Sequence, residues 1–290
     1  MAASTAVPDQ FRRAHANRRI RRYLGYAVLL FFAFLYLMPF VLAISASFKT
    51  RAEVASNPLG VIPDAATLDA WRVVGSSAFP LWLRNSVIVT LSVTLGRLFL
   101  DALAGYSLAR LDFPGRKLIF AGIVATLAVP GIVLAVPRFL VLRQLGMLNS
   151  FSGIILPLAV DAFGIFLMRQ FFMSIPKEIE EAAKVDGASV FTTWWRIVLP
   201  MAAPGLIALT ILSFQGSWNE FLHPLIAAPT NSRVWTLPLG LSQIAQATGE
   251  SLNTPVAMAG SMLTTLPVLI VFLVFQRYFI QGVAATGVKG

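Results

Sequence analysis

The chain has 290 residues, of which 57% are hydrophobic and only 12% are charged, and its mean hydropathy is +0.75. Soluble proteins average roughly 45–50% apolar and about 25% charged residues, so this composition excludes an ordinary soluble domain. The net charge is +10, but the aromatic residues lie inside long uncharged runs, which argues against nucleic acid as a partner. The lack of cysteine excludes disulfides and thiolate metal ligands, and the two histidines offer little for a metal site.

Six apolar stretches are each long enough to cross a bilayer, which requires about 20 mostly apolar residues. The second stretch carries Arg97 and Asp101, which are four positions apart on a helix and are expected to neutralise each other. Asn149 and Ser150 predict a turn just before the fourth stretch. The sequence therefore predicts an all-α integral membrane protein with six transmembrane helices at residues 23–48, 85–109, 118–137, 152–172, 197–219 and 251–276.

The distribution of basic residues predicts the orientation, because cytoplasmic loops of membrane proteins carry an excess of Lys and Arg. With six spans both termini share one side, which carries 15 of the 23 Lys and Arg, against 7 on the other side. Both termini are expected to be cytoplasmic. The boundaries follow as a basic N-terminal segment at residues 1–22, a six-helix membrane domain at 23–280 and a C-terminal tail at 281–290. The first apolar run is too long for the core of a cleaved signal peptide, so we expect an uncleaved anchor.

The cytoplasmic loop at about residues 173–200 is the most informative inward segment. Its sequence from 174 to 204 predicts two short helices joined by a hinge. Pro176 suits the first turn of a helix, and Glu180 is expected to pair with Lys184 one turn later. Gly187 ends this helix, and Ser189 can cap a second one that carries an aromatic stripe. Such an amphipathic pair fits the groove of another protein, while the alternative is a helix pair resting on lipid headgroups.

The order of residues in this segment resembles the EAA loop of permease subunits of binding-protein-dependent ABC transporters. The matching positions are Glu181, Ala182, Ala183, Asp186, Gly187, Ala188, Phe191, Ile197, Leu199, Pro200 and Pro204. The resemblance is closest to the carbohydrate-uptake subfamily, including the smaller six-span membrane subunit of the maltose transporter. Further matching stretches are residues 47–49, 85–86, 104–110, 113–116, 218–221 and 287–290.

The resemblance implies a bacterial plasma-membrane complex with a second homologous permease subunit, two copies of a cytoplasmic ATPase and an external substrate-binding protein. It implies that the EAA-type helix docks on the ATPase through Glu181, Ala182, Ala183, Asp186 and Gly187. The tail residues Gly287, Val288, Lys289 and Gly290 are expected to approach the same ATPase. This chain would be a transport subunit and not an enzyme, with no cofactor of its own. ATP and Mg²⁺ are expected on the ATPase, since this sequence has no phosphate-binding glycine loop.

The expected substrate is a sugar or sugar-like solute, with a glycerol-phosphate-type solute as the alternative. Carboxylates, amides and aromatic faces bind sugar hydroxyls, so Asp161, Gln215 and Asn219 are candidates for the substrate path. The alternative is that the companion subunit supplies most contacts and these residues serve packing. His223 is expected on the surface, and residues 218–221 are expected at the outer membrane interface.

Two other functional classes remain open from the residues alone. An intramembrane aspartyl protease would use two aspartates within spans, here Asp101 and Asp161, but their neighbouring residues do not fit that family. A self-sufficient secondary carrier would explain helix breaks at Pro130 and Pro157, although the inverted repeat it predicts is not apparent. Neither alternative accounts for the EAA-type segment.

Overall fold

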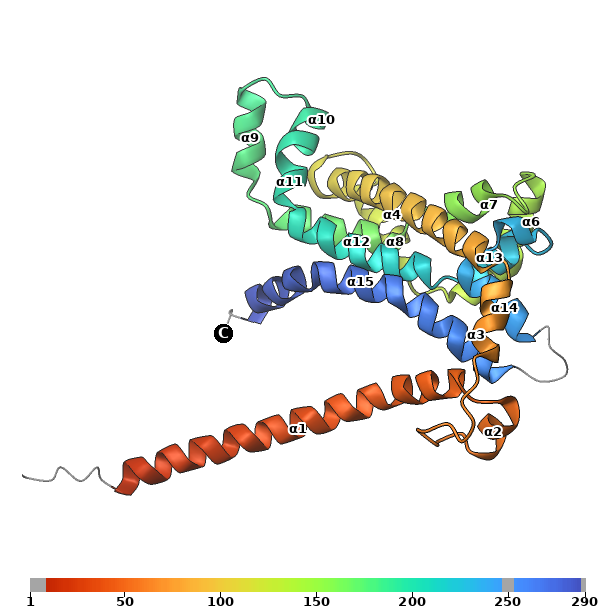
Figure 1. The fold of residues 1–290 in the computed structure, drawn as a ribbon. Helices are drawn as coiled ribbons and strands as arrows, with labels where there is room; N and C mark the ends of the chain where they lie inside the picture. Colours follow the sequence, from red (N-terminus) through yellow and green to blue (C-terminus); the bar gives the residue numbers. More distant parts are fainter. Residues whose placement is uncertain (1–8, 247–252, 288–290) are drawn as a thin grey trace, which may run out of the picture. The chain divides into compact units, whose positions relative to one another are not determined.

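A computed structural model describes the backbone of residues 9–246 and 253–287, and the side chains of residues 22–246 and 253–274. Within these residues the regular structure is entirely helical, which confirms the all-α prediction (Figure 1). The chain divides into two compact units, one of residues 1–71 with 253–262 and the other of residues 72–252 with 263–290. The last long helix, α15 (Thr254–Gly287), contributes to both units.

Four stretches are long and apolar enough to cross a membrane, namely Arg22–Ser47, Phe79–Arg110, Phe151–Ser174 and Thr254–Val274. Two further pairs of helices qualify only together, and each pair is sharply bent. The pair Arg116–Thr126 and Gly131–Gln144 bends by 99°, and the pair Val190–Met201 and Ala203–Trp218 bends by 80°. The protein is therefore a multi-pass membrane protein with four crossings, or up to six if each bent pair counts as one. Pro130 lies at the first bend, where its missing N–H and fixed φ break the helix.

The first unit contains α1 (Asp9–Ser47) and the short helix α2 (Arg51–Ser56), which Thr50 caps. Lys49 lies between them and is buried, with Nζ donating to the carbonyls of Asn57 at 3.0 Å and Gly60 at 2.6 Å. A buried ammonium requires such partners because it has left water. Lys49 thus closes the loop that follows α1.

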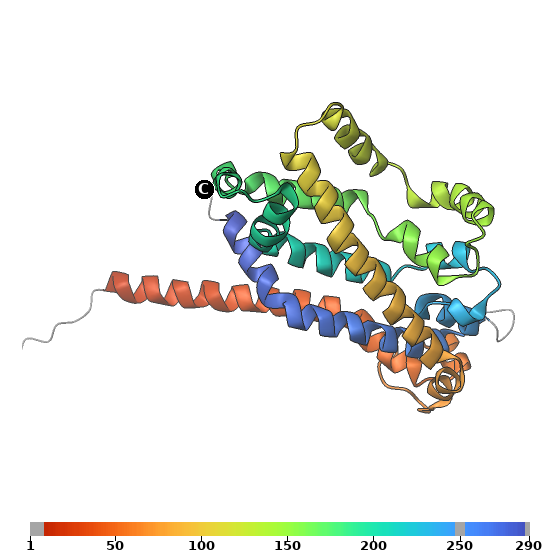
Figure 2. The same cartoon turned by 90° about the horizontal axis from the view of Figure 1, so that it is seen from above.

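The second unit is built around three helices that pack pairwise: α4 (Phe79–Arg110), α8 (Ala162–Ser174) and α12 (Ala203–Trp218). Figure 2 shows α4 lying across the other two. Close approach is possible because glycines face these contacts, and a Cβ on Gly105 would overlap the backbone of Arg169. The buried core here consists of Ala102, Tyr106, Met168, Phe172, Ile175, Trp194, Val198, Ala202 and Leu209.

Shorter helices flank this centre. On one side of it lie α9 (Lys177–Val185), α10 (Val190–Thr193), the π-helical turn η3 (Trp194–Val198) and α11 (Leu199–Met201). The remaining elements are α3 (Asp69–Ser76), α5 (Arg116–Thr126), η1 (Gly131–Leu134), α6 (Ala135–Gln144), α7 (Phe151–Ile155), η2 (Leu156–Leu158), α13 (Leu222–Ala227), η4 (Ser232–Val234) and α14 (Leu237–Gln246).

The start of α4 is fixed by polar contacts with the loop before α14. The amide Nδ2 of Asn85 donates to the carbonyls of Arg233 at 2.8 Å and Trp235 at 2.9 Å. Ser86 Oγ accepts the backbone N–H of Leu237 at 2.7 Å. Both side chains are buried, so these contacts satisfy backbone groups that water cannot reach. The Asn85-Ser86 stretch therefore anchors α14 to α4.

The turn predicted at Asn149 and Ser150 is present and precedes α7. Asn149 has φ +59°, a conformation that asparagine tolerates better than most residues, and Ser150 Oγ accepts the Gly153 N–H at 3.2 Å. The span that follows is not one straight helix, because η2 and the extended residue Asp161 separate α7 from α8.

One expectation about the chain after α12 is wrong. His223 is buried and not on the surface: its Nε2 lies 3.0 Å from the Gly153 carbonyl and so must carry the proton. Burial lowers the pKa of His223, helped by Arg138 and partly offset by the Gly153 carbonyl and Glu220. Trp218 is also buried, with Nε1 donating to the Thr264 carbonyl at 3.0 Å. Helical packing around both residues removes them from the surface.

Candidate functional site

The EAA-type segment forms a helix, a glycine turn and a second helix. Pro176 precedes α9 with φ −57°, and Glu178 and Glu180 lie in the first turn, where acidic side chains suit the helix dipole. Gly187 has φ +81°, and the Ala188 N–H donates to the Ala183 carbonyl at 2.9 Å. This left-handed residue closes the helix at low cost because glycine has no Cβ. Ser189 Oγ then caps α10 through the Thr192 N–H at 3.2 Å.

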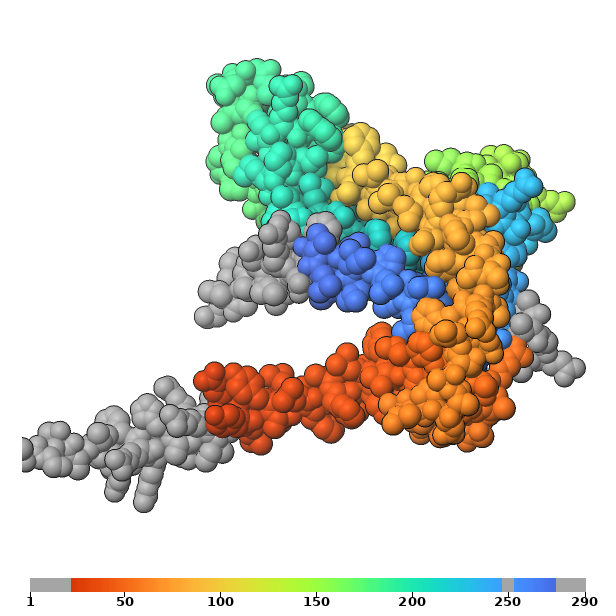
Figure 3. All heavy atoms as spheres, viewed as in Figure 1, coloured from red at the N-terminus to blue at the C-terminus, as the bar shows by residue number. Residues whose placement is uncertain are grey.

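The two faces of α9 have different environments. Ala183 is its buried residue, and Ile179 packs on the core formed by α4, α8 and α12. Glu181 and Ala182 are exposed, and Val185 is 87% exposed. Figure 3 shows the atoms of this segment projecting from the second unit. The outer face of α9 is therefore exposed, while its inner face packs on the second unit.

Glu180 lies on the inner face, where it contacts α4 and not its own helix. Its Oε1 forms an ion pair with Arg110 Nε at 2.7 Å, and its Oε2 accepts the Tyr106 hydroxyl proton at 2.9 Å. The expected pair with Lys184 is therefore wrong, because buried partners on α4 occupy both carboxylate oxygens of Glu180 while Lys184 is exposed. Arg110 also donates through Nη2 to the Ile175 carbonyl between α8 and α9.

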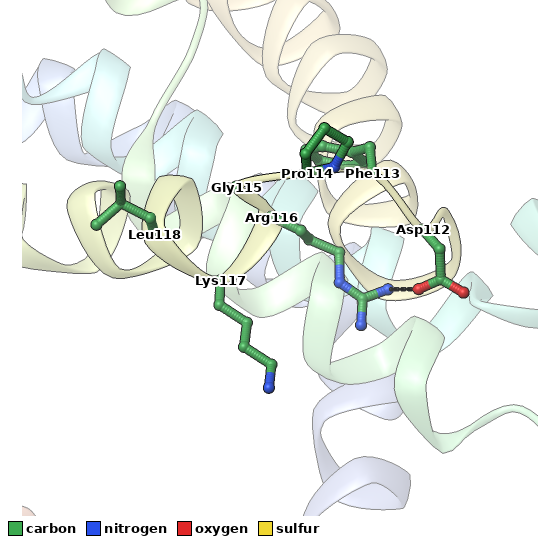
Figure 4. A pocket seen from close by; sticks show the side chains of 7 residues that line it. All are labelled: Asp112, Phe113, Pro114, Gly115, Arg116, Lys117 and Leu118. Carbon is green, nitrogen blue, oxygen red and sulfur yellow. Dashed lines mark hydrogen bonds and ion pairs between the residues drawn. The ribbon is translucent and has the colours of Figure 1, made fainter.

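The turn after α4 completes this end of the second unit. Gly115 has φ +82° and precedes α5, while Arg116 Nη1 reaches Asp112 Oδ1 at 2.8 Å and the Leu111 carbonyl at 2.9 Å. Figure 4 shows this pair closing the turn, with the Lys117 side chain extending away from it. The side chain of Asp112 is 95% exposed and that of Arg116 is 29% exposed, so this ion pair shapes the turn but adds little stability.

The membrane-embedded charges Arg97 and Asp101 do not form the expected pair with each other. Arg97 Nε donates to the Leu158 carbonyl at 2.8 Å, and Asp101 Oδ1 accepts the Asp161 backbone N–H at 3.0 Å. The two side chains therefore hold opposite ends of the break between α7 and α8. Asp161 caps α8 through its own carboxylate, which accepts the Gly164 N–H at 3.2 Å.

Residues 101–285 match the family described as "Binding-protein-dependent transport system inner membrane component". The chain belongs to this family. It is 35% identical over 264 residues to the arabinooligosaccharides transport system permease protein AraQ of Halalkalibacterium halodurans, with 90% of this chain and 94% of that protein covered. It is 32% identical over 273 residues to the sn-glycerol-3-phosphate transport system permease protein UgpE of Yersinia pestis, with 92% and 97% covered.

A solved structure has the same fold as this permease. It is a bacterial ABC transporter involved in the import of the acidic polysaccharide alginate, with a TM-score of 0.75 and 26% identity. The alignment covers 91% of this chain and 98% of that one. The permease is a transport component and not a catalytic one, which confirms that prediction and removes the intramembrane protease and the self-sufficient carrier as alternatives.

The candidate path residues of the permease lie on two neighbouring helices of the second unit. Gln215 and Asn219 are exposed and one turn apart at the end of α12, whereas Asp161 is half-buried at the start of α8. Within the described residues no hydrogen bond joins Asp161 to Gln215 or to Asn219. The carboxylate of Asp161 is already engaged by a backbone N–H, so Gln215 and Asn219 are the more available groups.

The remaining predicted residues are at the C-terminus. Gly287 is the last residue of α15, and Val288, Lys289 and Gly290 lie outside the described residues. Among the described residues no group of three or more His, Asp or Glu side chains is arranged to hold a metal ion.

Sequence reasoning missed the contact of Glu180 with Tyr106 and Arg110. The available signal was the spacing of the last two, which lie four positions apart at the end of an apolar span. A polar pair on one helix face at the membrane boundary indicates that something polar covers it. The sequence did not reveal which side chain does so.

Proposed function

We propose that this permease forms half of the translocation path of an ATP-driven importer for a sugar or sugar-like solute. Support comes from its relatives, whose names include an arabinooligosaccharide and a glycerol-3-phosphate transport system, and from its likeness to an alginate importer. A second homologous permease subunit supplies the other half of the path. An external binding protein delivers the solute, consistent with the description of the family.

The coupling to ATP runs through Glu181, Ala182, Ala183, Asp186 and Gly187. The observation that carries this assignment is the division of α9 into an inner face held by α4 and an outer face with Glu181, Ala182 and Val185 exposed. A helix held on one side and free on the other can enter a groove on a partner without first detaching. Two copies of a cytoplasmic ATPase would bind ATP and Mg²⁺, and this chain would bind neither.

The orientation follows from the positive-inside rule, with both termini and α9 on the cytoplasmic side of a bacterial plasma membrane. The C-terminal residues Gly287, Val288, Lys289 and Gly290 would approach the ATPase from the same side. Asp161, at the start of α8, would contribute to the solute path together with Gln215 and Asn219 at the end of the neighbouring helix α12. The exposed amides of Gln215 and Asn219 offer both donors and acceptors to sugar hydroxyls.

The test is co-purification of the tagged chain with the products of neighbouring genes, followed by an ATPase assay in lipid. The binding protein would be loaded with arabinooligosaccharides, other sugars or sn-glycerol-3-phosphate. We expect a second permease and an ATPase to co-purify, and hydrolysis to rise with one loaded binding protein. A stable chain that purifies alone and does not respond to ATP would overturn the proposal.

A further inference from the structure

Two adjacent glutamates on α9 serve opposite faces. Glu181 is exposed, whereas Glu180 reaches inward to Tyr106 and Arg110 at the end of α4. We propose that Glu180, Arg110 and Tyr106 form the positioning link through which movement of α9 is passed to α4. This inference rests on the proposed function, because it assumes that a partner moves α9.

The link consists of two separate contacts to one carboxylate, an ion pair and a hydrogen bond. Both carboxylate oxygens of Glu180 are engaged, one by Arg110 Nε at 2.7 Å and the other by the Tyr106 hydroxyl at 2.9 Å. Tyr106 and Arg110 lie one turn apart on α4, so the carboxylate is held along the axis of that helix. Two-point contacts to a charged group resist rotation in a way that a single contact does not.

The link is shielded from water. The side chain of Arg110 is 6% exposed and that of Glu180 is 16% exposed. Exposed ion pairs exchange readily with water and salt, but a buried pair keeps its geometry and is costly to separate. Movement of α9 therefore carries the end of α4 with it before the pair breaks.

The other contacts of α9 do not provide a comparable two-point contact. Ile179 packs on the apolar core, but such contact allows sliding because hydrophobic attraction has no preferred direction. The remaining charged side chains of the helix, Lys177, Glu178, Glu181 and Lys184, are exposed. Glu180 is thus the charged side chain that ties this helix to the membrane domain.

The helix α4, which carries Arg110 and Tyr106, also contacts other parts of the membrane domain. Arg110 donates to the Ile175 carbonyl, so it holds the connection between α8 and α9 as well as α9 itself. Further along the same helix, Arg97 and Asp101 hold the break between α7 and α8. A rigid α4 therefore connects the α9 contact to the broken span, as a chain of packed elements carries coupling between sites.

The experiment measures solute transported per ATP hydrolysed by the whole complex in proteoliposomes, with the sugar or sn-glycerol-3-phosphate that stimulates the wild-type complex. Glu180→Gln keeps the shape but removes the charge, and Tyr106→Phe keeps the ring but removes the hydroxyl. We expect both to retain ATP hydrolysis and to lower the transport ratio by roughly 2- to 30-fold, with Glu180→Gln the larger. Glu178→Gln, on the exposed side of the same helix, is the matched control and should leave the ratio unchanged.

The ratio separates a positioning role from a purely structural one. A purely structural defect lowers the amount of assembled complex. The complexes that do assemble still transport the wild-type amount of solute per ATP hydrolysed. The combination Arg110→Glu with Glu180→Arg restores the ion pair but not the contacts with Tyr106 and the Ile175 carbonyl, so it should recover part of the lost ratio. Glu180→Gln at the wild-type ratio, or a swapped complex of normal abundance that stays as poorly coupled as Glu180→Gln, would overturn the inference. A wild-type complex without ATP-driven transport would instead overturn the proposed function itself.

Discussion

Two interruptions of helical structure in this permease are held in opposite ways. The break between α7 and α8 is closed by α4, whose Arg97 binds the Leu158 carbonyl at 2.8 Å and whose Asp101 binds the Asp161 N–H at 3.0 Å. The turn at Gly187 is closed by its own backbone, and no atom lies within 4 Å of the place where a Cβ would stand.

The difference follows from the surroundings of each interruption. Backbone groups freed inside a membrane have no water to bind, so side chains from another helix must satisfy them. The signs also match, because a cation meets the carbonyl end of one helical piece and an anion meets the N–H end of the next. The Gly187 turn has no such constraint, so its surface remains available to a partner. The buried break is therefore a fixed element, and the exposed turn is an adaptable one.

The largest expected effect is at the buried break. Arg97→Leu removes the cation beside the fully buried Asp101 and leaves the Leu158 carbonyl without its donor. A hydrogen bond to a charged group contributes about 1.5–3 kcal/mol, and the loss of a cation near a buried carboxylate adds to that cost. We therefore expect a large loss of purified protein and a lower unfolding temperature in detergent.

The control for Arg97→Leu is Leu95→Ala, a substitution at an exposed position of the same helix. It should leave the yield and the unfolding temperature close to wild type. If Arg97→Leu behaved like this control, the charged closure of the break would not be what stabilises it.

A smaller effect is expected where α8 approaches α4. A Cβ on Gly164 would overlap Asp101 Oδ2, whereas a Cβ on Gly216 of α12 would meet no atom within 4 Å. Gly164→Ala should therefore destabilise the protein by about 1–3 kcal/mol, as overpacking does, and Gly216→Ala should be neutral. Thermal unfolding of both variants checks this, and equal unfolding temperatures would contradict the close packing.

At the exposed turn the prediction concerns coupling more than stability. Gly187→Val places a branched side chain at φ +81°, which costs roughly 1–2 kcal/mol but meets no neighbour. We expect the complex to assemble and to hydrolyse ATP while transport is uncoupled. Gly187→Asn, which tolerates the left-handed conformation, should be less affected. Normal transport by a Gly187→Val complex of normal abundance would contradict an essential turn at this position.

The smallest effect is a pH dependence at α13, which contacts α7 through His223. His223 Nε2 donates to the Gly153 carbonyl, and burial lowers the pKa of this histidine below its usual value of 6.5. Below about pH 6.5 the unfolded chain therefore binds more protons at this histidine than the folded chain does. The free energy of unfolding consequently falls as the pH drops below about 6.5, by up to about 1.4 kcal/mol per pH unit. His223→Gln cannot be protonated and should flatten this dependence between pH 7.5 and 5.5. Parallel curves for the two proteins would contradict it.

The sequence by itself determined the class of the molecule and the local structure of its most informative segment. Apolar run lengths predicted the membrane helices because the bilayer fixes how many residues must be apolar. Pro176, Gly187 and Ser189 predicted the helix, turn and helix of the EAA-type segment because caps and left-handed residues act over a few positions. The residue order around Glu181 indicated the family, which the match over residues 101–285 confirmed.

Only the tertiary structure decided the partners of the polar side chains. Sequence spacing paired Arg97 with Asp101 and Glu180 with Lys184, since a helix brings residues four apart together. In the fold Arg97, Asp101 and Glu180 each contact a different element instead. Arg97 and Asp101 bind backbone groups of the broken span, and Glu180 binds Arg110 and Tyr106 on α4. The same holds for His223, which packing buries against Gly153. A buried charge takes the partner that best replaces water, and packing between distant segments decides which partner that is.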